Sequence, residues 1–258
     1  MTAANGATAI SQSAGAGRIS RVLVVLNDPD SGLRRLASWW AADGLEIVTH
    51  PGPDGLPADL RGFAALALLG GGFMPDDDAT APWLVRERAL ARAAIDEGLP
   101  TLGICLGAQV LALVGGGSVR ANHGAAERGS TELRRAPATG DDGIFVDVPA
   151  QFRVIENHRD QIVRLPDDAV LLASSSTCRN QAFRIGDNAW GVQFHPEVDA
   201  ARLEHWDSAA LAADGFDRDA LVAGAAASEA ETARTCRSLA DAFARRVILG
   251  ARASVASA

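Results

Sequence analysis

The sequence predicts an α/β fold, a doubly wound and mostly parallel sheet flanked by helices. Short apolar runs rich in valine, isoleucine and leucine recur along the N-terminal part, and helix-like segments separate them. Strands that alternate with helices pair in parallel, and the helices cover both faces of the sheet. Ligands bind such sheets at the carboxyl ends of the strands, so a functional site is expected at that edge.

The first elements follow this pattern in order. Residues 21–26 (RVLVVL) form a continuous β-branched run, as expected for a strand buried on both faces. A helix is expected over 31–42, with Ser31 as its N-cap. Pro82 and Gly98 mark the start and the end of another helix. This helix is expected over 83–97, and two further strands are expected over 45–49 and 64–69.

Cys105 stands between a strand predicted over 100–104 and a helix predicted over 106–114. Gly103 and Gly107 frame it, which is the pattern of a nucleophile elbow, where a sharp turn exposes the reactive side chain. The unpaired amides at the start of the following helix stabilise negative charge on the sulfur. The sequence therefore predicts that Cys105 is a nucleophile.

The C-terminal half has a different texture. Residues 118–194 contain short strand-like runs separated by turns, which predicts an antiparallel section that returns to the sheet at 191–194. One helix is expected over 200–213 and a longer one within 218–249. The expected organisation is a disordered lead-in, one main domain, and a helical extension packed on that domain: 1–18, 19–213 and 214–258.

Composition limits the classes of function. The 258 residues are 48% hydrophobic and 22% charged, and the net charge of −8 argues against partners such as nucleic acid or an anionic membrane. Three cysteines without paired spacing favour a reducing compartment, and no apolar run is long enough for a membrane span, so a cytoplasmic location is expected. There is no phosphate-binding glycine motif and no metal-ligand spacing, so no cofactor is expected.

His195 and Glu197 supply the groups that a cysteine nucleophile needs. His195 follows a strand-like run, and the carboxylate of Glu197 comes two residues later, beyond Pro196. A base must hold or accept the proton of the thiol, and a third group must fix the orientation of that base. Cys105, His195 and Glu197 are therefore predicted to form a catalytic triad.

The motifs GICLGAQ around Cys105 and GVQFHPE around His195 resemble those of the class I (triad) glutamine amidotransferases. A third segment, LLGGGFM at 68–74, is similar to the glycine-rich oxyanion loop of that family. The resemblance extends over about 22–206, with the three motifs in the order of the family. The chain is most similar to stand-alone glutaminase domains of the GMP synthase type, which carry related segments at 157–160 and 180–183. The resemblance implies a flavodoxin-like class I amidotransferase fold.

The resemblance also implies roles for residues around the triad. The amides of Gly72 and Leu106 would form the oxyanion hole, and Gly71, Gln109, His158 and Asp160 would bind the substrate; Glu127 would also line the pocket. A solvated or structural role for Gln109 stays open. His158 is a rival catalytic base, although the sequence gives it neither the strand-end position nor the carboxylate partner of His195.

The remaining candidates have plainer interpretations. Phe73 replaces the proline that the family usually has after the glycine pair, so the loop is expected to be freer and to reach its oxyanion geometry when substrate or a partner binds. The other cysteines and histidines are interpreted as structural or surface residues: Cys178, Cys236, His50, His123 and His205.

The function predicted from these residues is hydrolysis of L-glutamine to glutamate and ammonia through a γ-glutamyl thioester on Cys105. The chain contains no synthetase domain, so a separate ammonia-accepting synthetase is the expected partner. Two alternatives stay open: a self-sufficient hydrolase or transferase of another γ-glutamyl compound, and a non-catalytic regulatory or binding protein with the same fold. The C-terminal extension would be either a docking element or a cover for the sheet.

Overall fold

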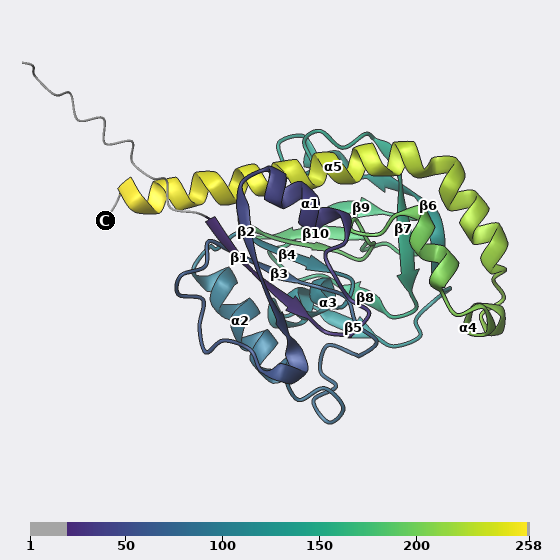
Figure 1. The fold of residues 1–258 in the computed structure, drawn as a ribbon, viewed down its shortest axis with the longest axis horizontal. Helices are drawn as coiled ribbons and strands as arrows, with labels where there is room; N and C mark the ends of the chain where they lie inside the picture. The colour runs from purple at the N-terminus through teal and green to yellow at the C-terminus, as the bar shows by residue number, and fades with distance from the viewer. Residues whose placement is uncertain (1–19, 257–258) are drawn as a thin grey trace, which may run out of the picture.

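A computed structural model describes residues 20–256 as one large sheet between two layers of helices (Figure 1). The predicted lead-in at 1–18 lies outside the described residues. The sheet has nine strands in the order β2-β1-β3-β4-β11-β10-β9-β6-β7. Five neighbouring strands pair in parallel, from β2 to β11, and the four beyond them pair antiparallel. The predicted fold class is confirmed.

The parallel strands are short and apolar. Val22, Val24 and Ala67 are completely buried, because helices cover both faces of this part of the sheet. The strands of the parallel part are β1 (Ser20–Leu26), β2 (Leu45–Pro51), β3 (Ala65–Leu68), β4 (Thr101–Ile104) and β11 (Ala189–Val192). Ile104 is in register with Val192, so the ends of β4 and β11 lie side by side.

The antiparallel section confirms the prediction for 118–194. Its strands in the large sheet are β6 (Glu127–Arg135), β7 (Gln151–His158), β9 (Val170–Ser174) and β10 (Ala182–Ile185). A separate two-stranded sheet pairs β5 (Ser118–Arg120) with β8 (Gln161–Arg164). Two short 3₁₀ helices, η1 (Gly52–Asp54) and η2 (Pro137–Thr139), occur in connections.

The helices divide between the two faces of the sheet. On one face, α1 (Arg35–Ala42) and the long α5 (Arg218–Ala256) pack together, with Trp40 and Phe243 5.3 Å apart between ring centroids. On the other face lie α2 (Leu84–Asp96) and α3 (Leu106–Val114). In Figure 1, α5 extends along the whole upper side of the molecule. Within residues 20–256, no helix is long and apolar enough to cross a membrane.

Two predicted helices differ from the structure. The helix expected at Ser31 begins at Arg35, and the Ser31 hydroxyl donates to the Gly70 carbonyl at 2.6 Å instead of capping a helix. The helix expected over 200–213 is two elements, the 3₁₀ helix η3 (Ala200–His205) and α4 (Ser208–Ala213). The Asp207 carboxylate accepts hydrogen bonds from the first amides of α4, and this cap separates the two.

Candidate active site

Cys105 occupies the sharp turn between β4 and α3. Its φ of 52° and ψ of −106° are rare for a residue with a side chain. The turn is tight because the chain passes close to itself on both sides. A Cβ on Gly103 would lie 2.5 Å from the Gly107 carbonyl carbon, and a Cβ on Gly107 would lie 2.6 Å from the Leu68 carbonyl carbon. The predicted elbow is therefore present, and both glycines are sterically required.

His195 and Glu197 lie beside this turn, just beyond the end of β11. The His195 Nδ1 is 2.7 Å from the Glu197 Oε1, and the His195 amide donates to the Ile155 carbonyl, which fixes the backbone. A Cβ built on Gly70 would touch both His195 Cε1, at 3.3 Å, and Cys105 Cβ, at 3.5 Å. The glycine at position 70 thus leaves room for the thiol and the imidazole to approach each other.

The electrostatics of His195 fit a histidine held between a carboxylate and a thiol. Burial lowers its pKa, but the Glu197 carboxylate and the Cys105 thiol raise it more, so that the pKa is well above its usual value. The His195 Nε2 is buried, and within residues 20–256 no hydrogen-bond partner of good geometry is present for it. Hydrogen bonds between catalytic groups are often long or poorly aligned before substrate binds.

The glycine-rich loop after β3 is held from behind by Asn27, the residue directly after β1. The Asn27 amide donates to the Leu69 carbonyl at 3.1 Å, and its oxygen accepts from the Trp83 indole at 2.9 Å. Phe73 packs edge-on against Trp83, with 5.5 Å between ring centroids. This packing anchors the loop in the free protein. That the oxyanion geometry forms only on binding stays a prediction.

The predicted oxyanion donors, Gly72 and Leu106, belong to the glycine-rich loop and to the start of α3. Gly71 and Gly72 line the same cavity as Cys105. Leu106 is the first residue of α3, so its amide has no partner within the helix.

Gln193 is a residue that the sequence analysis missed. Its side-chain amide nitrogen lies 3.6 Å from the Cys105 sulfur, and its oxygen lies 3.3 Å from the Gln109 Nε2. Gln109 is 2% exposed, so it is not solvated, and its Nε2 also reaches the Asp160 carbonyl at 3.5 Å. A signal was present, because the sequence predicts a strand through 191–194, and residues two apart in a strand, such as Gln193 and His195, share a side.

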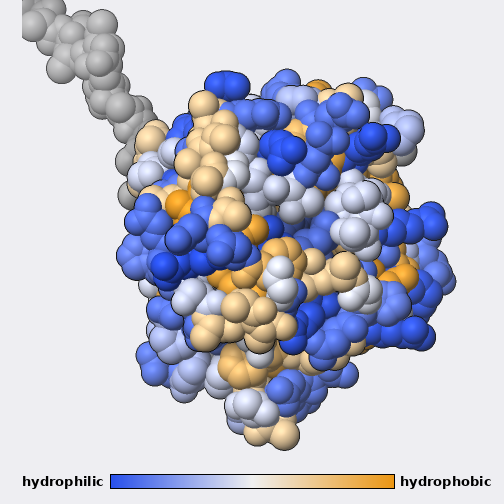
Figure 2. Space-filling view, turned by 90° about the vertical axis from the view of Figure 1, so that its right-hand side faces the viewer, coloured by the Kyte–Doolittle hydropathy of each residue, from blue (hydrophilic) through white to orange (hydrophobic). Residues whose placement is uncertain are grey.

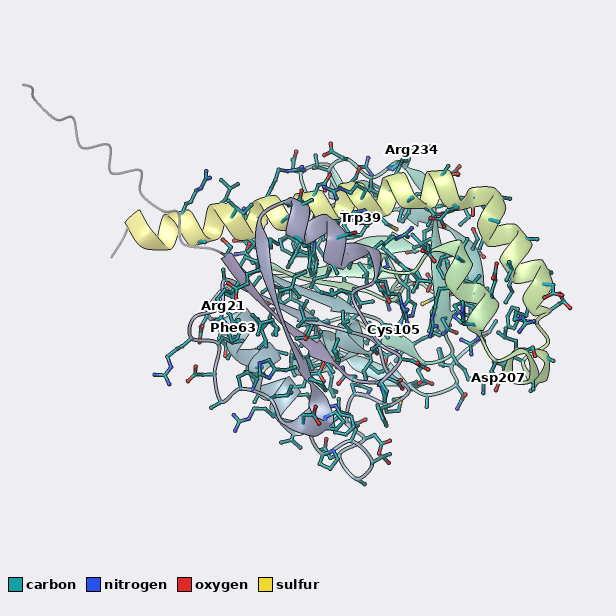
Figure 3. All side chains as sticks on the ribbon, viewed as in Figure 1. Arg21, Trp39, Phe63, Cys105, Asp207 and Arg234 are labelled. Carbon is teal, nitrogen blue, oxygen red and sulfur yellow. The ribbon has the colours of Figure 1, made fainter. Side chains whose placement is uncertain are left out.

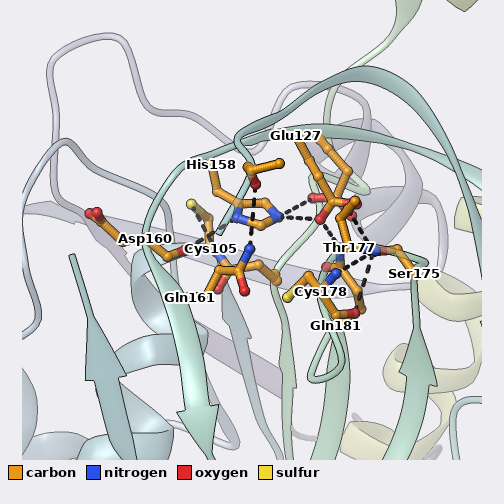
Figure 4. Close-up of polar contacts among 12 residues, drawn as sticks. Cys105, Glu127, His158, Asp160, Gln161, Ser175, Thr177, Cys178 and Gln181 are labelled. Atoms are coloured by element: carbon orange, nitrogen blue, oxygen red, sulfur yellow. Dashed lines mark hydrogen bonds and ion pairs between the residues drawn. The ribbon is translucent and has the colours of Figure 1, made fainter. Parts of the chain in front are cut away.

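His158 is the second histidine beside Cys105 (Figure 4). Its Nε2 lies 3.0 Å from the Glu127 carboxylate and 3.3 Å from that of Glu156, and its Nδ1 lies 3.2 Å from the Asp160 carbonyl. The expectation that His158 lacks a strand-end position and a carboxylate partner was wrong. It is the last residue of β7, and Glu156, two residues earlier on that strand, lies on the same side.

The surroundings of His158 exclude it as the base. Both ring nitrogens face acceptors, so both must carry hydrogen, and no lone pair remains to take a proton. Burial lowers the pKa of His158, but the Glu127 and Glu156 carboxylates raise it by more, so that the pKa is about 10. Burial raises the pKa of Glu127, but hydrogen bonds, first that from His158, lower it below its usual value. Burial keeps the pKa of Glu156 above its usual value.

Glu127 does not line the cavity; it lies behind His158 within a hydrogen-bond network. Its carboxylate accepts from the Thr177 hydroxyl and the Gln181 amide, both at 2.6 Å. Glu127, His158 and Cys178 offer donor atoms within 4.8 Å of one another, a set that suits a transition metal by type. However, burial raises the pKa of the Cys178 thiol to about 12, and the Glu127 oxygens already have partners. The group is therefore described better as a charged hydrogen-bond network.

The cavity in front of Cys105 has a volume of about 830 Å³. Gln109, His158, Asp160, His195 and Glu197 all line it. The outer wall of the cavity comes from η3 and α4. The sequence did not predict that these elements belong to the site. His205, which was interpreted as a surface residue, is exposed and lies in this wall. Figure 3 places Cys105 inside the molecule and Asp207 at the edge where α4 begins, and Figure 2 views that side, where apolar and charged surface meet around a recess.

Comparisons with known proteins agree with this architecture. Residues 46–205 match the family model described as glutamine amidotransferase class-I. A glutamine-hydrolyzing GMP synthase subunit of Thermoplasma acidophilum is 38% identical over 164 residues, 62% of this chain and 77% of that protein. A glutamine amidotransferase structure from Thermotoga maritima has a TM-score of 0.78 and 26% identity, covering 89% of this chain and 98% of that one.

A relative named for a different activity also matches. Gamma-glutamyl peptidase 3 of Arabidopsis thaliana is 35% identical over 124 residues, 45% of this chain and 48% of that protein. The corresponding GMP synthase subunit of Picrophilus torridus is likewise matched over only 51% of its length.

Proposed function

The chain belongs to the class-I glutamine amidotransferase family, and from that premise we propose that it is a glutaminase with Cys105 as its nucleophile. One observation carries the proposal. Cys105 is held in a strained backbone conformation at the start of α3, with the hydrogen-bonded His195–Glu197 pair beside it in the same cavity. Strain of this kind persists where the surrounding structure enforces it, and it is typical of active sites.

In the first half of the reaction, the proton of the Cys105 thiol passes to His195, and the sulfur attacks the side-chain carbonyl carbon of L-glutamine. Negative charge develops on the carbonyl oxygen, and the amides of Gly72 and Leu106 stabilise it. His195, oriented by Glu197, gives its proton to the departing nitrogen, so the C–N bond breaks and ammonia leaves. The product is a γ-glutamyl thioester on Cys105.

In the second half, His195 is neutral and takes a proton from water. The hydroxide equivalent attacks the thioester carbonyl in the same oxyanion hole, the C–S bond breaks, and glutamate leaves. We propose that the ammonia passes to a separate synthetase, because similar proteins are named as subunits of a glutamine-hydrolyzing synthase.

The test is release of glutamate and ammonia from L-glutamine by the purified chain, beside Cys105→Ala. Release is expected for the wild type and is expected to fall on the order of a thousandfold or more in the variant. An electrophilic glutamine analogue should add one mass equivalent to the wild type and none to Cys105→Ala, which retains Cys178 and Cys236. Labelling of the variant, or none of the wild type, would contradict the site.

A second candidate is hydrolysis of larger γ-glutamyl compounds without a partner. The matched γ-glutamyl peptidase and the volume of the cavity favour it, since cavities of roughly 300–1,000 Å³ accommodate drug-sized ligands. The two candidates differ in one measurement. A partner-dependent glutaminase would speed up when its synthetase is added, whereas a self-sufficient hydrolase would turn over γ-glutamyl dipeptides faster than glutamine when alone.

A further inference from the structure

Two arginines in the wall of the cavity hold one carboxylate between them. Arg128, near the start of β6, donates from Nη2 to the Asp214 Oδ2 at 3.0 Å, and Arg159, just after β7, pairs with the Asp214 Oδ1. Asp214 terminates α4. The three side chains line the same cavity as Cys105. The Asp214 carboxylate therefore occupies a position between two arginines inside this cavity.

Two guanidinium groups face one carboxylate in this contact. Asp160 is a second carboxylate whose charge acts on Arg128, and its Oδ1 already accepts a hydrogen bond from the Asn122 amide. Burial and the neighbouring Arg159 cation lower the pKa of Arg128 by more than nearby negative charge, including that of Asp160, raises it, and the arginine remains protonated. The other two arginines that line the cavity do not share a carboxylate. Arg34 donates to the Asp30 carbonyl, and only Arg202 lies near the Asp30 carboxylate, at 3.9 Å.

We propose that Arg128 and Arg159 bind a carboxylate of the γ-glutamyl substrate, and that Asp214 occupies their site in the free protein. The inference rests on the proposed function. Guanidinium groups match carboxylates in shape and charge, and Asp214 shows that this pair accepts one. Substrate must therefore displace Asp214 and the end of α4, and this internal competition weakens substrate binding. Gly215, at φ 84°, follows directly as the joint between α4 and α5.

Binding to the inactive Cys105→Ala chain, measured by calorimetry, tests the proposal without turnover. L-glutamine is compared with 4-aminobutanamide, which keeps the amide and the amine but lacks the carboxylate. Arg128→Gln should weaken L-glutamine binding on the order of tenfold or more, the usual size for a charge-assisted pair, and leave 4-aminobutanamide binding unchanged. Arg159→Gln should have a smaller effect, because its side chain is 46% exposed against 13% for Arg128.

Removing the internal competitor should have the opposite sign. Asp214→Asn keeps the size of the side chain and should tighten L-glutamine binding several-fold. The matched control is Arg92→Gln, on the exposed side of α2 and paired with Asp96, which should change neither ligand. Binding of γ-glutamylglycine identifies which carboxylate the arginines contact. If Arg128→Gln weakens binding of γ-glutamylglycine but not of L-glutamine, the arginines bind the carboxylate of the leaving group.

The inference and the proposed function fail in different ways. Equal weakening of L-glutamine and 4-aminobutanamide by Arg128→Gln would make the arginines a structural tie for α4 and overturn the inference. So would unchanged binding of all three ligands. L-glutamine that binds as expected but is not hydrolysed by the wild type would instead contradict the glutaminase.

Discussion

The two histidines beside Cys105 differ in the atoms that surround their ring nitrogens. His195 has one carboxylate on Nδ1, and among residues 20–256 its Nε2 makes no well-formed hydrogen bond, so it can exchange a proton with the nearby Cys105 thiol. His158 has acceptors on both nitrogens, and its raised pKa keeps it a cation beside Cys105 at neutral pH. One histidine can therefore act as the base, while the other fixes the Asp160 carbonyl and adds positive charge.

His158 should stay doubly protonated far above the usual histidine range. In ¹⁵N spectra both ring nitrogens should keep imidazolium shifts up to about pH 10, and Glu127→Gln should lower that midpoint. The folded pKa exceeds the usual value of 6.5, so the contribution of His158 to stability is complete below about pH 6.5 and is lost as the pH rises through 10. Titration near 6.5 in the folded wild type would contradict this assignment.

Glu87, on α2, should destabilise the protein at neutral pH. It is fully buried, and within the described part of the chain only one of its oxygens has a partner, the Asn27 amide at 3.0 Å. Burial raises its pKa from 4.5 to about 7. As the pH rises from 4.5 through 7, the unfolded chain releases this proton first, so stability is lost across that window.

Glu87→Gln keeps an oxygen for Asn27 and removes the buried charge. Its unfolding free energy, from urea titration, should exceed that of the wild type at pH 8 by on the order of 3 kcal/mol and by much less at pH 4.5. Exposed Glu97→Gln serves as the control and should show no such change. A gain of the same size at both pH values would contradict the titration of Glu87.

At the scale of elements, the sequence was most informative where local chemistry determines the conformation. Gly-x-Cys-x-Gly between an apolar strand and a helix predicted both ends of α3 correctly. Ser31 and the segment 200–213 were predicted wrongly, because a tertiary hydrogen bond to Gly70 and the cap at Asp207 override local propensity. Gln193 and Glu156 could have been found by strand alternation, whereas the pairing of Asp214 with Arg128 is a tertiary contact between residues far apart in the sequence.

The elbow gives a prediction with a matched control inside the chain. Gly107→Ala in α3 would place a Cβ against the Leu68 backbone and should cost on the order of 3 kcal/mol. Gly224→Ala in α5 has open space around its Cβ and should stabilise by about 1 kcal/mol through helix propensity. Thermal and urea unfolding of both variants measure the contrast. Similar effects from the two substitutions would show that the elbow is not crowded.

For the whole molecule, the principal question is whether 214–258 is separable from the rest. The boundary expected at 213 stays a prediction, and the family match ends nearby, at 205. Yet α5 supplies Leu239, Phe243 and Val247 to the same core as the sheet and α1. Composition could not reveal this, because the alanine-rich helix fits either a docking element or a cover.

If α5 is part of the core, its substitutions should destabilise the whole chain. Phe243 is fully buried between Trp40 and Trp190, so Phe243→Ala should cost about 3–5 kcal/mol. Leu249, on the same helix and 59% exposed, should tolerate alanine with a change below about 0.5 kcal/mol. Tryptophan fluorescence and circular dichroism should report one shared transition in the Phe243 variant, shifted to lower denaturant. Two separate transitions would instead show that α5 unfolds independently of the sheet, because a helix that only covers an already stable domain can detach without it.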